Sequence, residues 1–366
     1  MYPDLQFLLE HVLKTNVPSF LGMFKTFGFF VALAFLLSAY VLKKELLRKK
    51  ANGLLQPEWL PIDKAKKFLS KKEFAEGEGS LEPIFPHQRI GEIIILAAIG
   101  GLIGAKVFNA FESWDAFVQD PLNSLLSGSG LTFYGGFIIA AILIIYYCRK
   151  HKINLIHFCD AIGPALMLAY AIGRLGCHFS GDGDWGIFNS AYISMPDGSL
   201  KAATSQEFHQ VLLNSADYFT SNFGPITNVP CTHIKVPSGF PDWLFAMNFA
   251  HNVNNEGISI GGCPGSYCHM LPVSVLPTSL YESAICILFF VLLWIVRNKF
   301  NYGLHLFGLY LVLNGLERFF IEKIKVNYRY DWGFMHPAQS EIISVILLII
   351  GSGILLFFRN RKYYLK

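Results

Sequence analysis

Long apolar stretches separated by polar loops are the main pattern of this chain. Each stretch comes close to the about 20 residues that a helix needs to cross the hydrocarbon core of a bilayer. The pattern predicts an all-α polytopic membrane protein with seven transmembrane helices. Their approximate ranges are 20–42, 91–111, 131–148, 157–177, 278–297, 303–322 and 337–358.

The distribution of Lys and Arg predicts the orientation of these helices, because positively charged loops are retained in the cytoplasm. The loop 43–90, the loops after the third and fifth predicted helices and the C-terminal tail are all basic. They lie on one side if the N-terminus is outside and the C-terminus is cytoplasmic. A short segment with Lys323, Lys325 and Arg329 is the exception on the outer side.

The loop between predicted helices 4 and 5 is long and polar in character, with several Pro and Gly turns. It is expected to form a small external head rather than a linker. The predicted organisation is therefore 1–177 with helices 1–4 and the cytoplasmic loop 43–90, 178–277 as the head, and 278–366 with helices 5–7 and the basic tail.

The composition agrees with a membrane protein, since 53% of the residues are hydrophobic and 15% are charged. The net charge of +4 is explained by loops beside anionic lipid head groups. Nucleic-acid binding is not expected, because the basic residues lie in juxtamembrane loops without interleaved aromatic residues. Cys231, Cys263 and Cys268 lie in the head, where a disulfide or free thiols are favoured over a metal site. No metal or cofactor is expected.

Two arginines suggest chemistry at the outer rim of the membrane. Arg174 and Arg318 lie near the ends of two predicted helices, and a charge at that depth costs about 2.5–3.5 kcal/mol unless it is paired or hydrated. One alternative is an internal ion pair that only joins helices, and Arg318 with Glu322 four residues later has the spacing of such a pair. Two arginines from different helices at one level favour phosphate binding, because guanidinium groups bind phosphate bidentately. The phosphates at that depth belong to phospholipids.

Other polar side chains are expected at the same level. With the two arginines they form a set in the outer half of the membrane or at its rim: Tyr134, Arg174, His178, Asp182, Asp184, Glu282, Arg318, Glu322, Gln339 and Glu341. No nucleophile motif, P-loop or dinucleotide-binding motif accompanies them. Such a site fits transfer from a lipid to an acceptor that supplies the nucleophile, and it also fits lipid binding or transport.

Five motifs resemble those of the prolipoprotein diacylglyceryl transferase family. In chain order they are LTFYGGFI, GRLGCHFSGDGDWG, PTSLYES, LYLVLNGLERFFIE and HPAQSEI. The resemblance implies transfer of the diacylglyceryl group of phosphatidylglycerol to the lipobox cysteine thiol of a prolipoprotein, with release of glycerol phosphate. The partners would be phosphatidylglycerol and the prolipoprotein signal peptide. The location would be the bacterial cell inner (plasma) membrane.

The resemblance also implies roles for individual residues. Arg174 and Arg318 would hold the lipid phosphate and stabilise the charge that develops on it. Glu322 would orient Arg318, and Asp182 or Asp184 would match the acid that follows the arginine motif of the family. The lipid-binding residues implied are Arg174, Arg318, Gly135, Gly136 and Gly186.

The chain departs from the pattern of many family members at several positions. Tyr134 replaces a histidine, Phe27 and Asn314 each replace a tyrosine, and Cys177 replaces an asparagine. The attacking thiol must lose its proton, and His178 and Tyr134 are both candidates for the base. A lipid transporter, a receptor whose head binds a ligand and a catalytically inactive lipid-binding homologue are the alternative functions.

Overall fold

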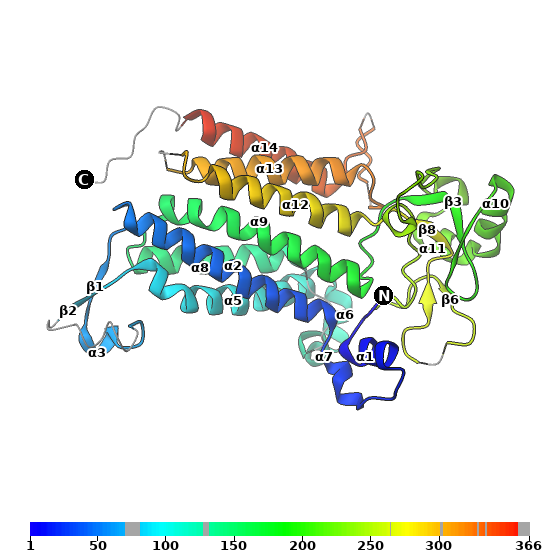
Figure 1. Cartoon of the computed structure of the whole chain (residues 1–366), viewed down its shortest axis with the longest axis horizontal. Coiled ribbons are helices and arrows are strands. Elements are labelled where there is room, and N and C mark those ends of the chain that lie inside the picture. The colour runs from blue at the N-terminus through cyan, green and yellow to red at the C-terminus, as the bar shows by residue number, and fades with distance from the viewer. Residues whose placement is uncertain are drawn as a thin grey trace. The chain divides into compact units, whose positions relative to one another are not determined.

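A computed structural model gives the fold, and it describes residues 1–69, 81–126, 132–263, 265–300, 303–327, 329–333 and 335–357. All seven apolar stretches are helical (Figure 1). Five of these helices, α2, α5 with the turn before it, α9, α12 and α14, are long and apolar enough to cross a membrane. The chain is thus mostly helical and multi-pass. The helices are α2 (Thr26–Ala51), α5 (Ile90–Glu112), α8 (Phe133–Lys150), α9 (Leu155–Ser180), α12 (Thr278–Val296), α13 (His305–Glu322) and α14 (Gln339–Phe357).

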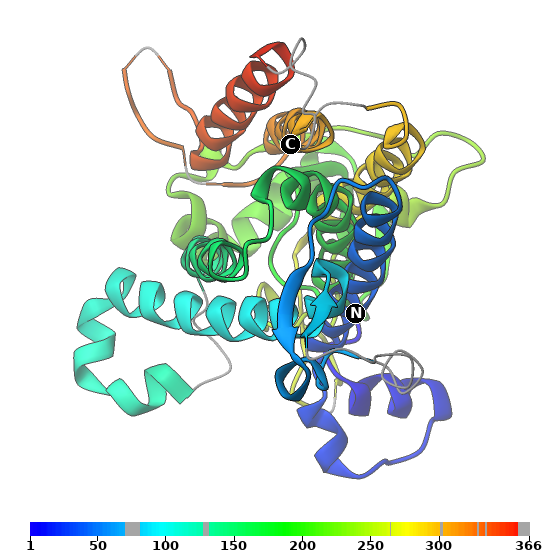
Figure 2. The same cartoon turned by 90° about the vertical axis from the view of Figure 1, so that its left-hand side faces the viewer.

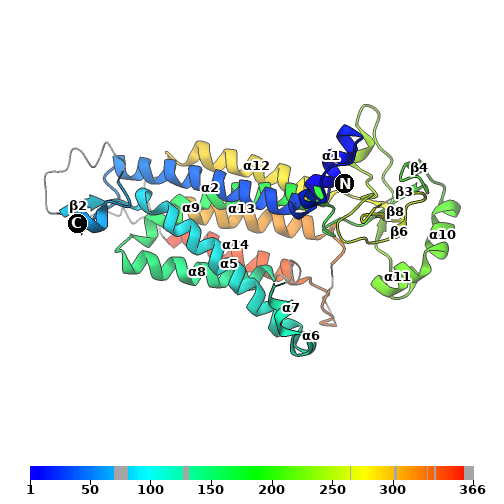
Figure 3. The ribbon, with the colours of Figure 1, turned by 90° about the horizontal axis from the view of Figure 1, so that it is seen from below.

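The chain divides into two compact units. The first comprises Met1–Leu37, Leu166–Lys299 and Gly308–Phe357, and the second includes Ser38–Ala165 and Phe300–Phe307. In the first unit α12, α13 and α14 run side by side (Figures 1 and 3). A Cβ on Gly351 of α14 would lie 2.8 Å from the carbonyl oxygen of Gly308 in α13. Glycines at such contacts let helices approach closely in lipid.

The head segment of the first unit contains a sheet, so the prediction of an all-α chain is wrong here. The strand β3 (Phe188–Ser194) pairs antiparallel with β4 (Leu200–Ala202) and β8 (Val273–Val275), and parallel with β5 (Cys231–Thr232). Alternate residues of β3 are buried, which is the pattern of a strand with one covered face.

Two helices, α10 (Ser205–Asn214) and α11 (Ala216–Phe223), lie beside this sheet (Figure 3). The core between them is apolar and includes Trp185, Phe188, Leu212, Phe219, Val229, Phe249, Leu271, Val273 and Val275. This segment therefore has a hydrophobic core of its own. The remaining elements of this unit are α1 (Leu5–Leu13), η1 (Ser19–Met23), η3 (Ile226–Asn228), η4 (Asp242–Leu244), β6 (Ile258–Ser259) and β7 (His269–Met270).

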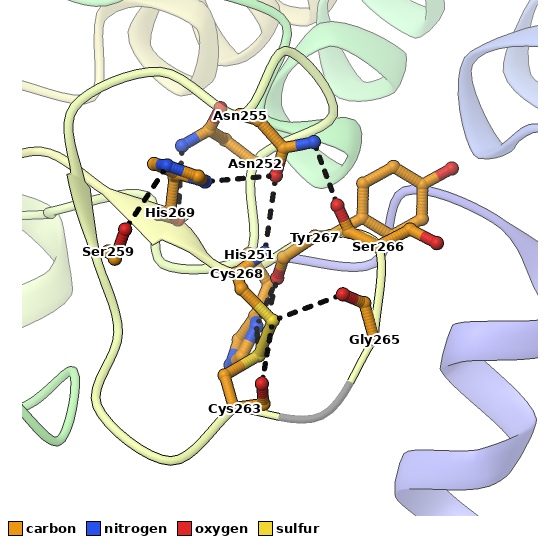
Figure 4. The surroundings of a disulfide bond; sticks show 10 residues. All are labelled: His251, Asn252, Asn255, Ser259, Cys263, Gly265, Ser266, Tyr267, Cys268 and His269. Atoms are coloured by element: carbon orange, nitrogen blue, oxygen red, sulfur yellow. Dashed lines mark hydrogen bonds between the residues drawn. A yellow bond between two sulfur atoms is a disulfide. The ribbon is translucent and has the colours of Figure 1, made fainter.

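A disulfide joins Cys263 and Cys268 in the head (Figure 4), which is one of the two outcomes favoured over a metal site. Asn255 holds the loop, because its side chain donates to the Ser266 carbonyl at 2.8 Å and accepts from the Cys268 amide at 3.2 Å. The hydroxyl of Tyr267, inside the loop, donates to Asp4 at 2.9 Å. The disulfide loop is therefore tied to the residue that caps α1.

The second unit is built around the contact between α5 and α8. Two short helices, α6 (Trp114–Gln119) and α7 (Pro121–Leu126), follow the end of α5 and turn the chain (Figure 2). A two-stranded sheet of β1 (Glu58–Pro61) and β2 (Leu81–Ile84), the short helix α3 (Ile62–Ala65) and the turn η2 (Pro86–Arg89) precede α5.

The predicted loop 43–90 begins later than expected. The helix α2 continues to Ala51, because the Lys, Glu, Leu and Arg residues after position 42 all have high helix propensity. Part of this loop, 70–80, and the basic tail after Phe357 lie outside the described residues.

Gly135 and Gly136 of α8 face α5 at a very short distance. A Cβ on Gly135 would lie 2.3 Å from the Cβ of Phe108 and 2.6 Å from the Gly104 carbonyl oxygen. A Cβ on Gly136 would lie 2.7 Å from the carbonyl oxygen of Gly101. In this structure both glycines are explained by helix packing.

The Gly135→Ala substitution is therefore expected to lower the free energy of unfolding by about 1–3 kcal/mol, the usual cost of overpacking. Gly101→Ala is the matched control, because a Cβ on Gly101 has nothing within 4 Å. Thermal unfolding of both variants in detergent tests this. Equal midpoints for the two variants would contradict the close contact.

Candidate functional site

Four charged side chains from distant parts of the chain, two of them buried and two half-buried, form a cluster in the first unit, defined here as the ion-pair cluster. Arg174 of α9 pairs through one terminal nitrogen with Asp184 and, at 2.5 Å, through its Nε with Glu282 of α12. Lys325, which follows α13, contacts the same two carboxylates at 2.5 and 2.6 Å. Two cations thus alternate with two carboxylates.

Glu282 and Lys325 form the part of the ion-pair cluster that is shielded from solvent, whereas the Asp184 side chain is 25% exposed. The Glu282 side chain is 0% exposed and that of Lys325 is 2% exposed, against 14% for Arg174. Buried charges are tolerated when partners compensate them, and removing one partner leaves an uncompensated charge. Burial lowers the pKa of Lys325 to about 8, and the charge of Arg174 adds to this lowering while Glu282 opposes it. The cluster therefore joins the ends of α9, α12 and α13 at one point.

The turn after α9 contains two glycines and brings Asp184 into contact with Arg174. Gly181 and Gly183 have φ values of +68° and +72°, a region that other residues rarely adopt. Asp182 lies between them, and burial raises the pKa of its carboxyl group. A base with a raised pKa accepts protons better near neutral pH.

Gly186 fixes the other end of this turn. Its amide donates to the Leu276 carbonyl at 2.8 Å, and the next amide, of Ile187, donates to the Ile324 carbonyl at 2.9 Å. A Cβ on Gly186 would lie 2.8 Å from that Ile324 oxygen. Gly186 is thus required for the close crossing that carries Lys325 into the ion-pair cluster.

Arg318 differs from Arg174 in its partners. Its terminal nitrogen donates to the hydroxyl of Tyr170 at 2.9 Å, and the guanidinium of Arg174 lies 5.2 Å from the centre of the same tyrosine ring. Within the described part of the chain, no carboxylate lies within 4 Å of the Arg318 nitrogens. A half-buried guanidinium with one neutral partner retains most of its donors for an anion, since guanidinium has five N–H groups.

The other predicted site residues have separate partners. Glu322 accepts a hydrogen bond at 2.6 Å from Asn327. Among the described residues it forms no ion pair with Arg318 within 4 Å, so the i, i+4 pair is not formed. His178 contacts the Ser279 hydroxyl at 3.4 Å. Tyr134 is half-buried at the start of α8 in the second unit.

Comparison with known protein families identifies the chain. The family model described as prolipoprotein diacylglyceryl transferase matches residues 67–357. The chain belongs to this family.

Individual diacylglyceryl transferases are similar over most of their length. A phosphatidylglycerol–prolipoprotein diacylglyceryl transferase of Leptospira interrogans is 26% identical over 389 residues, covering 90% of this chain and 88% of the relative. That of Staphylococcus haemolyticus is 26% identical, covering 75% and 74%. That of Chlorobaculum tepidum is 24% identical, covering 80% and 81%.

Sequence reasoning missed two residues that organise this candidate site. Tyr170, which contacts both arginines, lies four residues before Arg174 and so shares its helical face, a signal that was available. Lys325 was visible only as an exception to the charge bias of the loops. Its burial between Asp184 and Glu282 explains why a cation occurs on that side.

Proposed function

We propose that this chain transfers the diacylglyceryl group of phosphatidylglycerol to the lipobox cysteine thiol of a prolipoprotein, the first step of bacterial lipoprotein maturation. Family membership supports the reaction, and the names of the relatives give both substrates. Within this structure, the proposal rests mainly on Arg318. Its guanidinium is half-buried and donates a hydrogen bond to the uncharged side chain of Tyr170. A lipid phosphate is the anion that such a group would meet at a membrane surface.

In the proposed reaction the thiolate sulfur attacks the glycerol carbon that carries the phosphate. A carbon–sulfur bond forms, the carbon–oxygen bond breaks, and glycerol phosphate leaves with the electron pair. Arg318 would stabilise the charge that grows on the phosphate oxygens. Arg174 is already paired with Asp184 and Glu282, and it could bind a phosphate only after breaking one of these pairs. We therefore assign Arg174 mainly a structural role in the ion-pair cluster.

The proton of the thiol requires an acceptor. Asp182 is half-buried beside the ion-pair cluster, and burial raises the pKa of its carboxyl, which favours it as a general base. His178 and Tyr134 remain candidates from the sequence. Each would return the proton to the departing phosphate or to water, which balances the reaction.

The proposed topology has seven transmembrane helices in the bacterial inner membrane, with the N-terminus and the head outside and the C-terminus in the cytoplasm. The ion pairs support this orientation, because the cations that oppose the charge bias are neutralised by carboxylates. Lys323 pairs with Glu341 at 2.7 Å and Arg329 pairs with the same carboxylate at 3.5 Å.

The proposed function is tested with purified protein, phosphatidylglycerol and a synthetic lipobox peptide, followed by mass spectrometry. The peptide is expected to gain the mass of one diacylglyceryl group, and a Cys-to-Ser peptide is expected to gain none. An unmodified peptide, beside an active family member as control, would contradict the proposal and favour a lipid transporter or an inactive lipid-binding protein.

The head cysteines are not expected to participate in the reaction. A variant with Cys231, Cys263 and Cys268 all changed to Ser should retain most transfer activity, because none of these sulfurs contacts the ion-pair cluster in the described structure. The same peptide assay measures this. Loss of transfer by a variant that still folds would show that the head contributes to the reaction.

A further inference from the structure

One face of the two-stranded sheet in the second unit is apolar and exposed. Trp59 of β1 lies opposite Pro83 of β2, and Pro61 lies opposite Leu81. Directly opposite residues of antiparallel strands point to the same side of a sheet, so these four side chains share one face. Trp59 is 60% exposed and Leu81 is 49% exposed. We call this surface the ribbon face; it consists of Trp59, Pro61, Leu81 and Pro83.

The opposite face of the same sheet packs against the protein. Ile84 is buried there, and Glu58 pairs with Arg89 at 2.5 Å. His151, which directly follows α8, contacts the same Glu58 carboxylate at 3.0 Å. Since successive residues of a strand point to opposite faces, the ribbon face points away from these contacts.

The sheet is held at the point where α5 begins. Arg89 immediately precedes α5, and Glu92 lies in its first turn. Glu58 of β1 pairs with Arg89, and Lys67, shortly after α3, pairs with Glu92 at 2.5 Å. The strands and α3 lie together at one end of this unit (Figure 1). Because Pro86–Glu112 is long and apolar enough to cross a membrane, the sheet lies at the surface of the bilayer that this segment enters.

The chain around the ribbon face is basic. Residues 43–69 contain eight Lys and Arg and three Asp and Glu. Lys50, at the end of α2, lies 4.0 Å from the centre of the Phe85 ring, and Phe85 directly follows β2. Lys64 of α3 is exposed. Basic residues beside a membrane attract anionic lipid head groups, and tryptophan is enriched at the membrane–water interface. An exposed apolar face with Trp59 in a basic surface therefore fits an anionic lipid surface.

Pairing with a strand of another protein is disfavoured at this sheet. Both strands are edge strands, because the described sheet has two strands. The strand β1 contains Pro61 and β2 contains Pro83, and proline on an edge strand disfavours pairing with a further strand. Contact with lipid requires no backbone hydrogen bonds from the sheet, so the prolines are compatible with it.

We propose that the ribbon face inserts into the anionic lipid surface of the leaflet that α5 enters, which is the cytoplasmic leaflet in the proposed topology. Trp59 and Leu81 lie among the lipid head groups, and Lys50 and Lys64 face the lipid phosphates. The sheet thereby anchors the start of α5 at one depth in the bilayer. This inference does not depend on the transfer reaction, because it concerns a different surface and its test requires no turnover.

Spin labels on two neighbouring residues of β2 test this in the full-length protein. Leu81→Cys places a label on the ribbon face, and Glu82→Cys places the matched control on the opposite face. Both variants carry Cys231→Ser, because Cys231 is the exposed free cysteine. The labelled protein is placed in nanodiscs of phosphatidylglycerol and phosphatidylcholine in equal parts. Collisions of the label with oxygen, which concentrates in lipid, and with a water-soluble nickel chelate are measured by electron paramagnetic resonance. The oxygen-to-nickel collision ratio should be several-fold higher at residue 81 than at residue 82.

The basic surface predicts a dependence on lipid charge. In nanodiscs of phosphatidylcholine alone, the collision ratio at residue 81 should fall toward the ratio at residue 82. Lys64→Gln should lower the ratio of inserted to water-exposed label in the phosphatidylglycerol nanodiscs by about fivefold, the contribution of one basic residue near an anionic surface. Lys201→Gln is the matched control, because Lys201 is an exposed cation of the head, and it should leave that ratio unchanged.

Three results would overturn the inference. A high rate of collision with nickel at residue 81 would show that water covers the ribbon face. Low rates of collision with both oxygen and nickel would show that protein covers it, such as a second copy of this chain. Equal insertion in phosphatidylglycerol and in phosphatidylcholine nanodiscs would show that an anionic surface is not what the face recognises.

Discussion

Arg318→Ala is expected to reduce kcat for diacylglyceryl transfer by about 10²–10³-fold, the usual loss when one donor to a developing negative charge is removed. The protein should remain folded, because among the described residues the Tyr170 hydroxyl is the one polar partner of this side chain. The kcat of Arg318→Lys should lie between those of the wild type and Arg318→Ala, since lysine keeps the charge and loses the bidentate geometry. Initial rates of peptide modification measure all three proteins.

Lys201→Ala provides the matched control for this experiment. Lys201 is a cation on the head surface that pairs with Glu207 at 2.8 Å, and its side chain is 54% exposed. Its loss should leave the rate unchanged, since surface pairs contribute little. Wild-type turnover by Arg318→Ala would remove the assignment of Arg318 to the lipid phosphate.

Arg174→Ala is expected to destabilise the protein as well as inactivate it. The substitution leaves Asp184 and Glu282 with Lys325 as their one remaining cation in the described structure. Breaking a buried pair by removing one partner costs about 3–5 kcal/mol. Thermal unfolding in detergent should show a clear fall in the midpoint, larger than that of Arg318→Ala.

A double variant separates charge balance from other effects of Arg174. Arg174→Ala with Asp184→Asn leaves one cation, Lys325, and one carboxylate, Glu282, so part of the lost stability should return. Such recovery is a coupling energy between residues in contact. The loss of unfolding free energy caused by Asp184→Asn is measured in the wild type and in Arg174→Ala. Equal losses in the two backgrounds would show that the two residues are not coupled and would contradict the ion-pair cluster.

The sequence predicted the long helices well and the sheet of the head poorly. A stretch of about 20 apolar residues is a local signal, and all seven such stretches are helical. The sheet of the head depends instead on distant pairing, since β3 near residue 190 pairs with β8 near residue 274. Strand preference depends strongly on such tertiary context, and short polar strands separated by long loops carry no periodic pattern that identifies them.

For the candidate site, the sequence indicated the types of residue but not which side chains contact one another. Two arginines could be recognised because they lie near the ends of apolar stretches, and Arg174 does lie among acids. Their partners could not be read from spacing. Arg318 bonds Tyr170 rather than Glu322, because residues four apart share a helical face but tertiary contacts decide which side chains meet. Lys325 joins the ion-pair cluster only through the crossing at Gly186.

Two of the predicted lipid-binding glycines illustrate a further limit. The family resemblance implies that Gly135 and Gly136 bind the lipid. In the structure they allow α5 and α8 to approach each other, with Gly104 and Phe108 closest to Gly135. A glycine in a membrane helix indicates a close contact, and the sequence does not say with what.

Arg318 is proposed to hold a phosphate that leaves as the thioether forms. The most direct measurement uses phosphatidylglycerol labelled in its glycerol head group, with purified protein and the lipobox peptide, and counts both products in one reaction. One released glycerol phosphate is expected for each thioether formed, and both products should fall in parallel in Arg318→Ala. Peptide modification without release of glycerol phosphate, or release that does not depend on Arg318, would contradict it.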